Sequence, residues 1–355
     1  MSNDSNAETS EKDEVHIDAS AGTVEIDRTT ARRAAASVFR IHGIDPEDAE
    51  TTARMLITAE ARGKSSHGLI RLPRYVRGIE HGNVDINGES EIVRDAGAAA
   101  TIEGGARLGP PVAVDATAEA TARANEFGIG AVGVNDTNHL GTLGYYTDLA
   151  RREGYVALAV TNTEPVIPPY GGAEPILGTN PIAVGLPTDP PFNLDMSTSA
   201  IARGSLEEAA ERGESIPEGV ALGPDGEPTT DPEAALAGTI LPFGGPKGSG
   251  LAIAIEVLAG GLVGASMGQE VTGTYHTEEP CRKGDLFIAI DPEILGGAGA
   301  VERIEAFLER LTDVDPASGH DGVRLPGSST RSDECKQTIE IDHDLWERIS
   351  DLAEK

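Results

Sequence analysis

Helix-like and strand-like segments alternate between residues 112 and 161, and this pattern restricts the fold more than any other feature of the sequence. Small apolar residues recur at helical spacing over 112–126, and a strand-like run follows over 130–135. A second helix, which ends near Glu153, leads to a strand over 155–161. Alternation of this kind is typical of α/β domains. We therefore expect a central α/β domain.

Further elements are expected on both sides of this region. Asp27 is placed as the N-cap of a helix that runs to about Ile41. Asp45 and Pro46 give a second helix its N-cap and its first residue. The other expected elements are strands over 85–95, 181–187, 192–195 and 286–291, and helices over 69–81, 199–211, 249–264, 299–311 and 343–353. The helix over 249–264 is expected to be buried, because Glu256 is its only charged residue.

The chain is strongly acidic. It has 59 Asp and Glu residues against 28 Lys and Arg, a net charge of −31, and only six of these cations are lysines. Nucleic-acid binding through a basic surface is excluded, because neutralising phosphates needs the opposite sign of charge. A large acidic excess with few lysines predicts a protein that works in high salt, where the Debye length falls to about 3 Å at 1 M. An ordinary acidic cytosolic protein is the alternative.

Cysteine usage and the first residues predict a cytoplasmic protein. Cys281 and Cys335 form neither a disulfide framework nor a Cys-x-x-Cys motif, which fits a reducing compartment. The N-terminal stretch MSNDSNAETSEKDE lacks the basic and apolar regions of a secretory signal. The longest apolar stretch, 251–265, is too short to cross a bilayer. We therefore expect neither a membrane nor a nucleic acid as partner.

Two glycine motifs match known signatures but stand in the wrong context. GIGAVG at 128–133 matches the dinucleotide-binding fingerprint, yet it follows a helix and opens a strand, the reverse of what that loop requires. Gly128 is better explained as a helix C-cap. GASMG at 264–268 matches the nucleophile elbow of hydrolases, but Ser266 follows a helix instead of a strand. Neither motif predicts a function.

The glycine-rich loop 244–250 precedes the apolar helix. Free backbone N–H groups at a helix N-terminus favour an anion, and Lys247 in this loop is one of only six lysines. The spacing of a P-loop is absent. A plain helix cap and a ligand-binding loop are both consistent with these residues.

Two of the eight histidines, His67 and His139, lie in loops between small polar residues and glycine. Histidine titrates near neutrality and is suited to proton transfer. Arg71, one turn beyond His67, is suited to holding a carboxylate by two parallel hydrogen bonds. A set of His67, His139 and Asp195 also fits a two-histidine, one-carboxylate metal site, so a metal-dependent hydrolase is an alternative.

Six strings of the sequence, in order and in register, resemble the malate/L-lactate dehydrogenase family, which includes ureidoglycolate and sulfolactate dehydrogenases. They are SSHGLIRLPRYVRGIEHGNV, NHLGTLGYY, YGGAEPILGTNPIAVGLPT, LDMSTSAIARG, GEPTTDP and LPFGGPKGSGLAIAIEVLAG. The resemblance covers roughly residues 27–330. Ser205 departs from it, because many relatives carry lysine after the Ala-Arg-Gly.

The resemblance implies roles for residues at matching positions. His139 matches the histidine that accepts and donates the proton, and His67 is the second catalytic candidate. The matching substrate-binding residues are Ser66, His67, Arg71, Thr179 and Asn180. The matching cofactor-binding residues are Thr163, Asp195, Met196, Ser197, Lys247, Gly248, Pro326, Gly327 and Ser328. No residue is expected to bind a metal.

The resemblance also implies a fold. It is a non-Rossmann α/β fold with a mixed-sheet nicotinamide-binding domain and a helical domain built from the N- and C-terminal segments. We expect a disordered acidic tail over 1–21, an N-terminal helical segment with the substrate loop over 22–95, the central nicotinamide-binding domain over 96–292, and a C-terminal segment over 293–355 that packs back on the N-terminal part. A homodimer or a higher homo-oligomer is implied.

The implied activity is NAD(P)-dependent transfer of hydride between nicotinamide and a small (S)-2-hydroxy acid or 2-keto acid. Malate or L-lactate is the expected substrate, and ureidoglycolate or sulfolactate is the alternative. NAD is the expected cofactor, with NADP possible. We expect His139 to titrate with an apparent pKa of about 6–8. Outside the family, the alternatives are the hydrolase and an acidic binding or scaffold protein.

Overall fold

The computed structural model describes residues 16–18, 22–274, 276–328 and 335–354. Within these ranges, no helix is both long and apolar enough to span a bilayer. Most of the acidic segment over 1–21, expected to be disordered, lies outside the described residues. His16–Asp18 is described, and it forms strand β1 instead of part of a tail.

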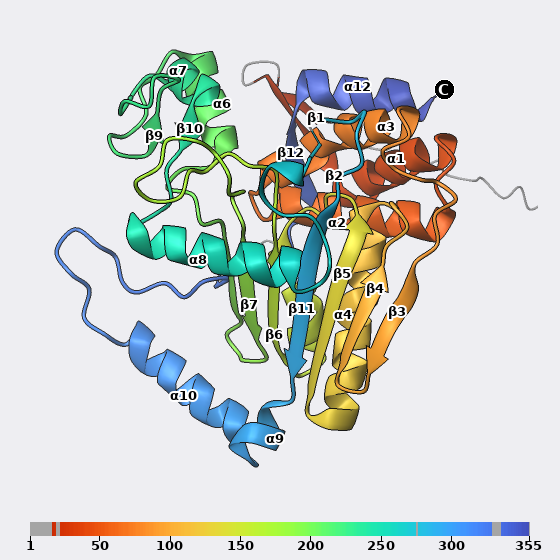
Figure 1. Ribbon diagram of the computed structural model, residues 1–355, viewed down its shortest axis with the longest axis vertical. Coiled ribbons are helices and arrows are strands. Elements are labelled where there is room, and N and C mark those ends of the chain that lie inside the picture. The colour runs from red at the N-terminus through yellow and green to blue at the C-terminus, as the bar shows by residue number, and fades with distance from the viewer. Residues whose placement is uncertain (1–15, 19–21, 275, 329–334, 355) are drawn as a thin grey trace, which may run out of the picture.

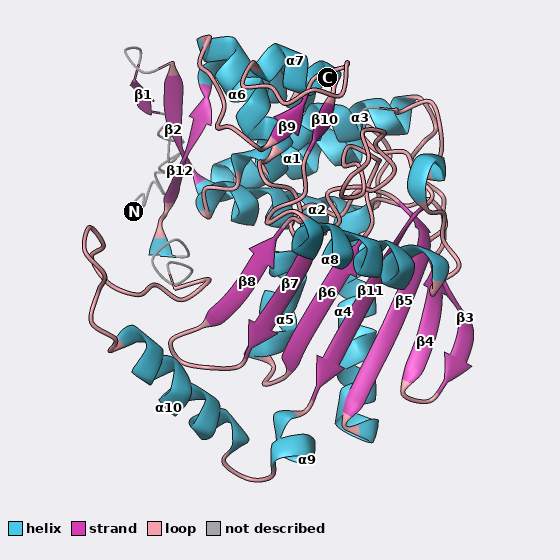
Figure 2. Ribbon diagram, turned by 60° about the vertical axis from the view of Figure 1, so that its left-hand side comes forward, coloured by secondary structure: helices cyan, strands magenta, loops and turns pink. Residues whose placement is uncertain are grey.

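A seven-stranded mixed sheet forms the centre of the molecule (Figure 2). Its strands stand in the order β3-β4-β5-β11-β6-β7-β8, and only β4 and β5 pair in parallel. They are β3 (Glu91–Ala96), β4 (Ala99–Glu103), β5 (Ile129–Thr137), β6 (Val156–Thr161), β7 (Ile182–Leu186), β8 (Phe192–Met196) and β11 (Lys283–Ile290). The predicted mixed sheet is confirmed, and it differs from the parallel sheet of a Rossmann fold.

Helices cover both faces of this sheet (Figure 1). On one face, α4 (Gly109–Phe127) packs on β5 and β11, and α5 (Leu143–Arg152) packs on β6 and β7. On the other face, α8 (Pro246–Glu256) continues into a π-helical turn, Val257–Gly261. Gly128 ends α4 with a φ of +83°, so the predicted C-cap is confirmed.

The two ends of the chain meet in a second unit beside the sheet. β2 (Thr23–Asp27) lies between β1 and β12 (Thr338–Asp342) in an antiparallel sheet, and α12 (His343–Ala353) packs on α1 (Arg28–Ile41). The predicted helical domain built from both terminal segments is confirmed by this pairing.

Helices α1 and α2 (Pro46–Ala61) begin where the sequence predicts them. The carboxylate of Asp27 accepts hydrogen bonds from the N–H groups of Thr29 and Thr30, and Asp45 accepts one from Glu47. These bonds satisfy donors that a helix N-terminus leaves unpaired. The apolar faces of both helices bury Phe39, Met55 and Leu56 in a core shared with α4 and the sheet.

The remaining elements lie around these two units. They are α3 (Leu72–Glu80), α6 (Arg203–Arg212), β9 (Ala221–Leu222), α7 (Pro232–Ala237), β10 (Thr239–Ile240), α9 (Pro292–Gly296), α10 (Ala300–Thr312) and the 3₁₀ turns η1 (Ser65–His67), η2 (Leu69–Arg71) and η4 (Gly268–Glu270). A second apolar cluster, which includes Ile167 and Leu206, fills the lobe formed by α6, α7, β9 and β10.

Three sequence predictions need correction. The helix expected over 69–81 begins at Leu72, because two 3₁₀ turns precede it. The helix expected to be buried over 249–264 is buried on one face only; Ile253, Val257 and Leu262 are 46%, 53% and 66% exposed. Strands β4 and β12 were not predicted, and both depend on partners elsewhere in the chain.

Candidate active site

His139 and His67 meet where the central sheet borders the N-terminal helices. His139 lies in the loop between β5 and α5, and His67 lies in η1, directly after α2. Their rings stack at 5.7 Å between centroids, with an angle of 26° between the planes. The structure therefore brings together two loops that are more than 70 residues apart in sequence.

The hydrogen bonds of His139 fix which ring nitrogen faces the reacting atoms. The backbone N–H of Gly141 donates to Nδ1 of His139 at 3.2 Å, and the hydroxyl of Tyr75 contacts the same atom at 2.7 Å. A peptide N–H can only donate, so Nδ1 is an acceptor and the neutral ring carries its proton on Nε2. Among the described residues, both hydrogen bonds of the ring are made by Nδ1. Nε2–H is the group left for a ligand.

The charge state of His139 differs from what its sequence context predicts. Burial is the main cause that lowers its pKa well below the usual value, and the positive charge of Arg71 comes second. His67, Lys283 and Arg74 add to the effect. These causes act against the expected apparent pKa of about 6–8 in the ligand-free site, because burial and nearby cations both disfavour imidazolium.

His67 is held by its neighbour in the same turn. Nδ1 of His67 lies 3.0 Å from the hydroxyl oxygen of Ser66. Burial, followed by the charge of Arg71, lowers the pKa of His67 to about 4, although Asp195 acts in the opposite direction. At neutral pH both rings are therefore uncharged, which removes the repulsion that two stacked imidazolium ions would suffer.

Arg71 is anchored beside this pair. Its Nε donates to the carbonyl oxygen of Ser66 at 2.6 Å, and its Nη1 donates to the hydroxyl of Thr274 at 3.1 Å. These contacts fix the plane of the guanidinium, whose fork geometry is suited to a planar carboxylate.

Glu60 holds the loop that carries His67. Its carboxylate accepts a hydrogen bond from the N–H of Leu69 at 2.8 Å, and burial raises its pKa. Gly68 lies against the same carboxylate, and a Cβ at this position would collide with it. The glycine that follows His67 is therefore required by packing.

Asp195 is placed at the end of β8 and forms an ion pair with Lys64. Gly144, in the first turn of α5, packs directly against the Asp195 side chain, so a Cβ there would overlap it. The family resemblance assigns Asp195 to the cofactor, but nothing in the sequence points to Lys64, which lies three residues before His67. The pair joins the histidine loop to the edge of the sheet.

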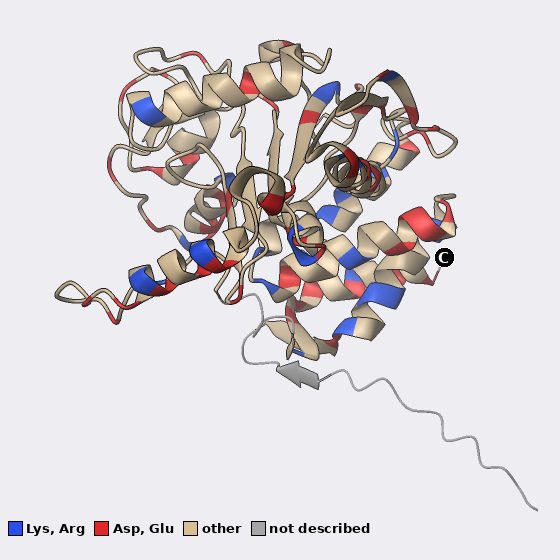
Figure 3. Ribbon diagram, turned by 90° about the horizontal axis from the view of Figure 1, so that it is seen from below, with Lys and Arg blue, Asp and Glu red and all other residues tan. Residues whose placement is uncertain are grey.

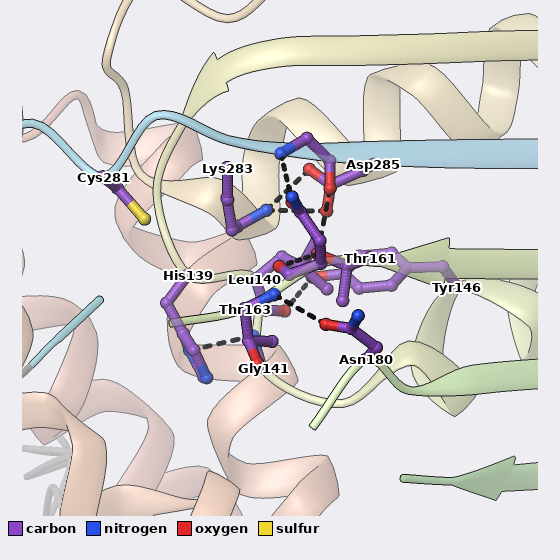
Figure 4. A network of polar contacts seen from close by, with 12 residues as sticks. His139, Leu140, Gly141, Tyr146, Thr161, Thr163, Asn180, Cys281, Lys283 and Asp285 are labelled. Carbon is purple, nitrogen blue, oxygen red and sulfur yellow. Dashed lines mark hydrogen bonds and ion pairs between the residues drawn. The ribbon is translucent and has the colours of Figure 1, made fainter. Parts of the chain in front are cut away.

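A second polar group lies next to His139 (Figure 4). The side-chain oxygen of Asn180 accepts from the N–H of Thr163 at 3.2 Å, and the N–H of Thr179 donates to the hydroxyl of Thr163 at 2.9 Å. Glu256, 6% exposed, accepts from the side-chain amide of Asn180 at 2.7 Å and from that of Asn162 at 3.0 Å. A buried carboxylate thus fixes the turn that carries Thr179 and Asn180.

A buried ion pair lies on β11, close to the same region (Figure 4). Nζ of Lys283 lies 2.6 and 2.7 Å from the two carboxylate oxygens of Asp285, and the two residues are 4% and 1% exposed. Both carboxylate oxygens of Asp285 neutralise the ammonium of Lys283. Lys283 is therefore suited to stabilising the local structure and its electrostatic field, and less suited to binding a ligand directly.

The other predicted cofactor residues lie further along the surface of the sheet and α8. Met196 and Ser197 follow Asp195, and the hydroxyl of Ser197 lies 2.6 Å from that of Ser199. Lys247 is exposed in the first turn of α8, whereas the backbone of Gly248 packs on Phe243. In the Pro326–Gly327–Ser328 turn, the carbonyl of Pro326 accepts from the N–H of Asn193 in β8. Within the described residues, no hydrogen bond joins Lys247 or this turn to the histidines.

The chemistry of these donors fits a nicotinamide cofactor. Thr163 lies just after β6, Thr179 just before β7, and Ser197 and Ser199 just after β8, the strand that carries Asp195. A carboxylate and neutral hydroxyls are suited to ribose hydroxyls and a carboxamide. Gly178 packs so closely on Thr163 that only glycine fits there. Without a side chain, Gly178 leaves its own backbone uncovered next to Thr163.

The metal-site alternative finds no geometric support. Asp195 is paired with Lys64, and His67 and His139 face each other ring to ring. In the described part of the chain, the one group of three side chains whose ligand atoms lie close enough for an ion is His343, Asp344 and Glu347 on α12, away from the histidine pair.

Several residues of the site could not be found from the sequence. Tyr75, which contacts His139, gave only a weak signal: it lies four residues after Arg71 on the predicted helix, hence on the same face. Thr274 and Glu256 gave none, because their contacts with Arg71 and Asn180 join distant parts of the chain.

Comparison with known proteins decides the family. The model of the family described as malate/L-lactate dehydrogenase matches residues 26–350. The chain belongs to this family. It is 44% identical, over 315 residues, to L-sulfolactate dehydrogenase of Methanothermobacter thermautotrophicus, covering 87% of this chain and 91% of that protein. It is 42% identical, over 318 residues, to malate/(S)-sulfolactate dehydrogenase of Methanothermus fervidus, covering 88% and 92%.

The fold is also that of a solved member of the family. The structure of sulfolactate dehydrogenase from Methanocaldococcus jannaschii superposes with a TM-score of 0.88 at 39% identity, covering 93% of this chain and 96% of that one. The chain is therefore a 2-hydroxy acid dehydrogenase of the malate/L-lactate dehydrogenase family, a family of NAD(P)-dependent enzymes. The hydrolase and scaffold alternatives are overturned by this membership.

Proposed function

We propose that the enzyme interconverts a small (S)-2-hydroxy acid and its 2-keto acid, with malate as the leading substrate, L-lactate next, and sulfolactate or ureidoglycolate as alternatives. The observation that supports this most is the stacked pair His139 and His67 with the anchored guanidinium of Arg71 beside it. A 2-keto acid needs a donor at its carbonyl oxygen and a cation at its carboxylate, and this arrangement offers both.

In the proposed mechanism the carboxylate of the keto acid lies against Arg71, and its carbonyl oxygen lies against Nε2 of His139. Negative charge grows on this oxygen during reduction. Imidazolium His139, protonated at both nitrogens, donates Nε2–H to this oxygen and then gives up that proton, which leaves a neutral ring with its proton on Nδ1. Tyr75 serves both states of the ring, because its hydroxyl can donate to a bare Nδ1 and accept from a protonated one. In oxidation, the neutral ring takes the hydroxyl proton of the substrate at a bare Nε2, so its own proton must lie on Nδ1, where the hydroxyl of Tyr75 accepts it. The ligand-free ring, with its proton on Nε2, therefore changes tautomer before it acts as the base.

Thr163, Asp195, Met196, Ser197, Lys247, Gly248 and the Pro326–Ser328 turn are the proposed cofactor-binding residues, with Ser66, Thr179 and Asn180 on the substrate side. When bound, the nicotinamide supplies or takes the hydride. NAD is the proposed cofactor and NADP the alternative. The chain's own part is to hold the reacting carbon in place and to move a proton at Nε2 of His139.

A substrate panel tests the proposal. Purified enzyme in high salt is given NADH or NADPH with oxaloacetate, sulfopyruvate, pyruvate or the oxo product of ureidoglycolate, and the loss of nicotinamide absorbance is followed. We expect at least one of these acids to be reduced, and Arg71→Lys to raise its KM more than that of the cofactor, since an ammonium lacks the fork geometry. If no acid is reduced with either cofactor, the proposal fails.

Three further features complete the proposal. The homodimer is proposed to form through the exposed apolar face of α8 and the turn that follows it, which carries Ile253, Val257 and Leu262. Cys281 and Cys335 are both unpaired, which supports a reducing compartment such as the cytoplasm. Work in high salt is proposed from the net charge of −31.

A further inference from the structure

A small pocket, with free space for about one water-sized group, opens beside His139, and the mechanism above does not use it. Its walls come from α3, from the loop before His139 and from the segment around Thr274. His139 is itself part of the wall, so the pocket borders the place where the substrate is proposed to lie. The residues that matter for the argument are Arg74, Tyr75, Asn138, His139, Thr274 and Thr277.

The residues that line the pocket carry a positive charge and no carboxylate, although the chain as a whole is strongly acidic. About one residue in six of the whole chain is Asp or Glu, yet none of the residues around the pocket is. The one permanently charged side chain in the wall is Arg74. The other polar groups include the hydroxyls of Thr274 and Thr277 and the amide of Asn138. In so acidic a protein, a pocket without carboxylates is suited to an anion.

Arg74 and Arg71 are arranged to bind two ends of one small molecule. Arg71 precedes α3 and Arg74 lies in its first turn, so the two residues share a face, about 5–6 Å apart at Cβ. Thr274 connects them: its hydroxyl accepts from Nη1 of Arg71 at 3.1 Å, and the same residue lines the pocket of Arg74. Both guanidinium groups also act on His139 as positive charges.

We propose that Arg74 binds a second anionic group of the substrate, and so selects 2-keto acids that carry a carboxylate or a sulfonate at the far end over those that end in a methyl group. The inference rests on the proposed function, because it assumes that the first carboxylate lies at Arg71. It names Arg74 as the specificity-determining residue of the site. Pyruvate has no second anionic group to place at Arg74.

The test compares kcat/KM for oxaloacetate, sulfopyruvate and pyruvate in the wild-type enzyme, Arg74→Gln and Arg74→Lys. Arg77→Gln is the matched control, since Arg77 lies one turn further along the same helix and is exposed. We expect wild type to prefer at least one of the two dianions over pyruvate. Arg74→Gln should lower kcat/KM for that dianion by about 10- to 100-fold, the range for a lost charge-assisted hydrogen bond, and that for pyruvate less than threefold. Arg74→Lys should fall between, and Arg77→Gln should match wild type.

The possible results distinguish a failure of the inference about Arg74 from a failure of the proposed function. A wild-type enzyme that reduces pyruvate as well as both dianions overturns the inference without any variant, so the test does not depend on whether Arg74→Gln folds. Equal losses for dianions and pyruvate in Arg74→Gln also overturn it, because they would mean a general effect on the site. If oxaloacetate and sulfopyruvate differ in their dependence on Arg74, the class of the second anion is identified. Failure to reduce any keto acid contradicts the proposed function instead.

Discussion

The ionisation of His139 is the feature on which the chemistry depends at the scale of single residues. Burial and four neighbouring basic groups lower its pKa well below 6.5 in the ligand-free site. Reduction needs the protonated ring, so its kcat/KM should fall as pH rises through this low pKa and keep falling across neutrality. Oxidation needs the neutral ring, so its kcat/KM should stay flat near neutrality and fall only in acid. The measurement is kcat/KM against pH in both directions at constant salt.

The bound substrate should shift this behaviour. Its carboxylate neutralises part of the positive charge at Arg71, so the pKa of His139 rises in the complex and kcat should inflect at a higher pH than kcat/KM. In His139→Gln the shared inflection should vanish and kcat should fall by roughly 10²–10⁴-fold. Tyr75→Phe, which removes one contact of Nδ1 and keeps Nε2, should keep an inflection but move it to a different pH, because the hydroxyl of Tyr75 contacts Nδ1. If His139→Gln kept the pH dependence of kcat/KM in both directions, the titrating group would be His67 instead.

At the scale of elements, the sequence predicts those helix starts and turns that are determined by contacts between residues close together in the chain. The caps Asp27 and Asp45 bond to N–H groups two or three residues away, so the starts of α1 and α2 could be predicted. The stacked histidines were found through motif resemblance, whereas Tyr75 and Thr274 were not, since their contacts join residues 64 and 203 positions apart. β12 was missed for the same reason: its partner is β2, at the other end of the chain.

Helix α8 shows most clearly what the sequence leaves out. Its composition predicts burial, yet Ile253, Val257 and Leu262 are exposed while Glu256, its only acid, points inward to Asn162 and Asn180. A second copy of the chain is the occupant that explains this face, because two acidic molecules can meet there without bringing carboxylates together. The apolar face is therefore expected to be an interface between copies.

Light scattering after gel filtration tests this interface. We expect wild type to have twice the chain mass of 36.9 kDa. Leu262→Glu places a charge at the centre of the contact and should yield monomers. Leu295→Glu is the matched control, because Leu295 is 78% exposed on α9 and lies outside this face. A monomeric wild type, or a Leu262→Glu dimer as stable as wild type, would contradict the assignment.

At the scale of the whole molecule, charge is the property that governs stability. The net charge is −31, and acidic side chains occur on most surface elements (Figure 3). The compact state concentrates these carboxylates more than the unfolded chain does, so their repulsion opposes folding whenever it is not screened. Basic partners offset part of it locally: Arg62, Arg151 and Arg152 surround Asp148 and, against its burial, hold the pKa of this carboxyl below its usual value. Such clusters are too few to balance the excess.

We therefore expect the melting temperature to fall as KCl is lowered from about 3 M to 0.1 M, a range over which the Debye length grows from under 3 Å to about 10 Å. Most of the fall should occur below about 1 M, because the repulsion is already screened above that concentration. Sucrose is the control, since it favours compact states through exclusion from the protein surface but does not screen charge. If sucrose restored the melting temperature at 0.1 M KCl as fully as added salt does, surface exclusion and not screening would be the cause. A melting temperature that stayed constant throughout would contradict adaptation to salt and leave the dehydrogenase chemistry of His139 and Arg71 untouched.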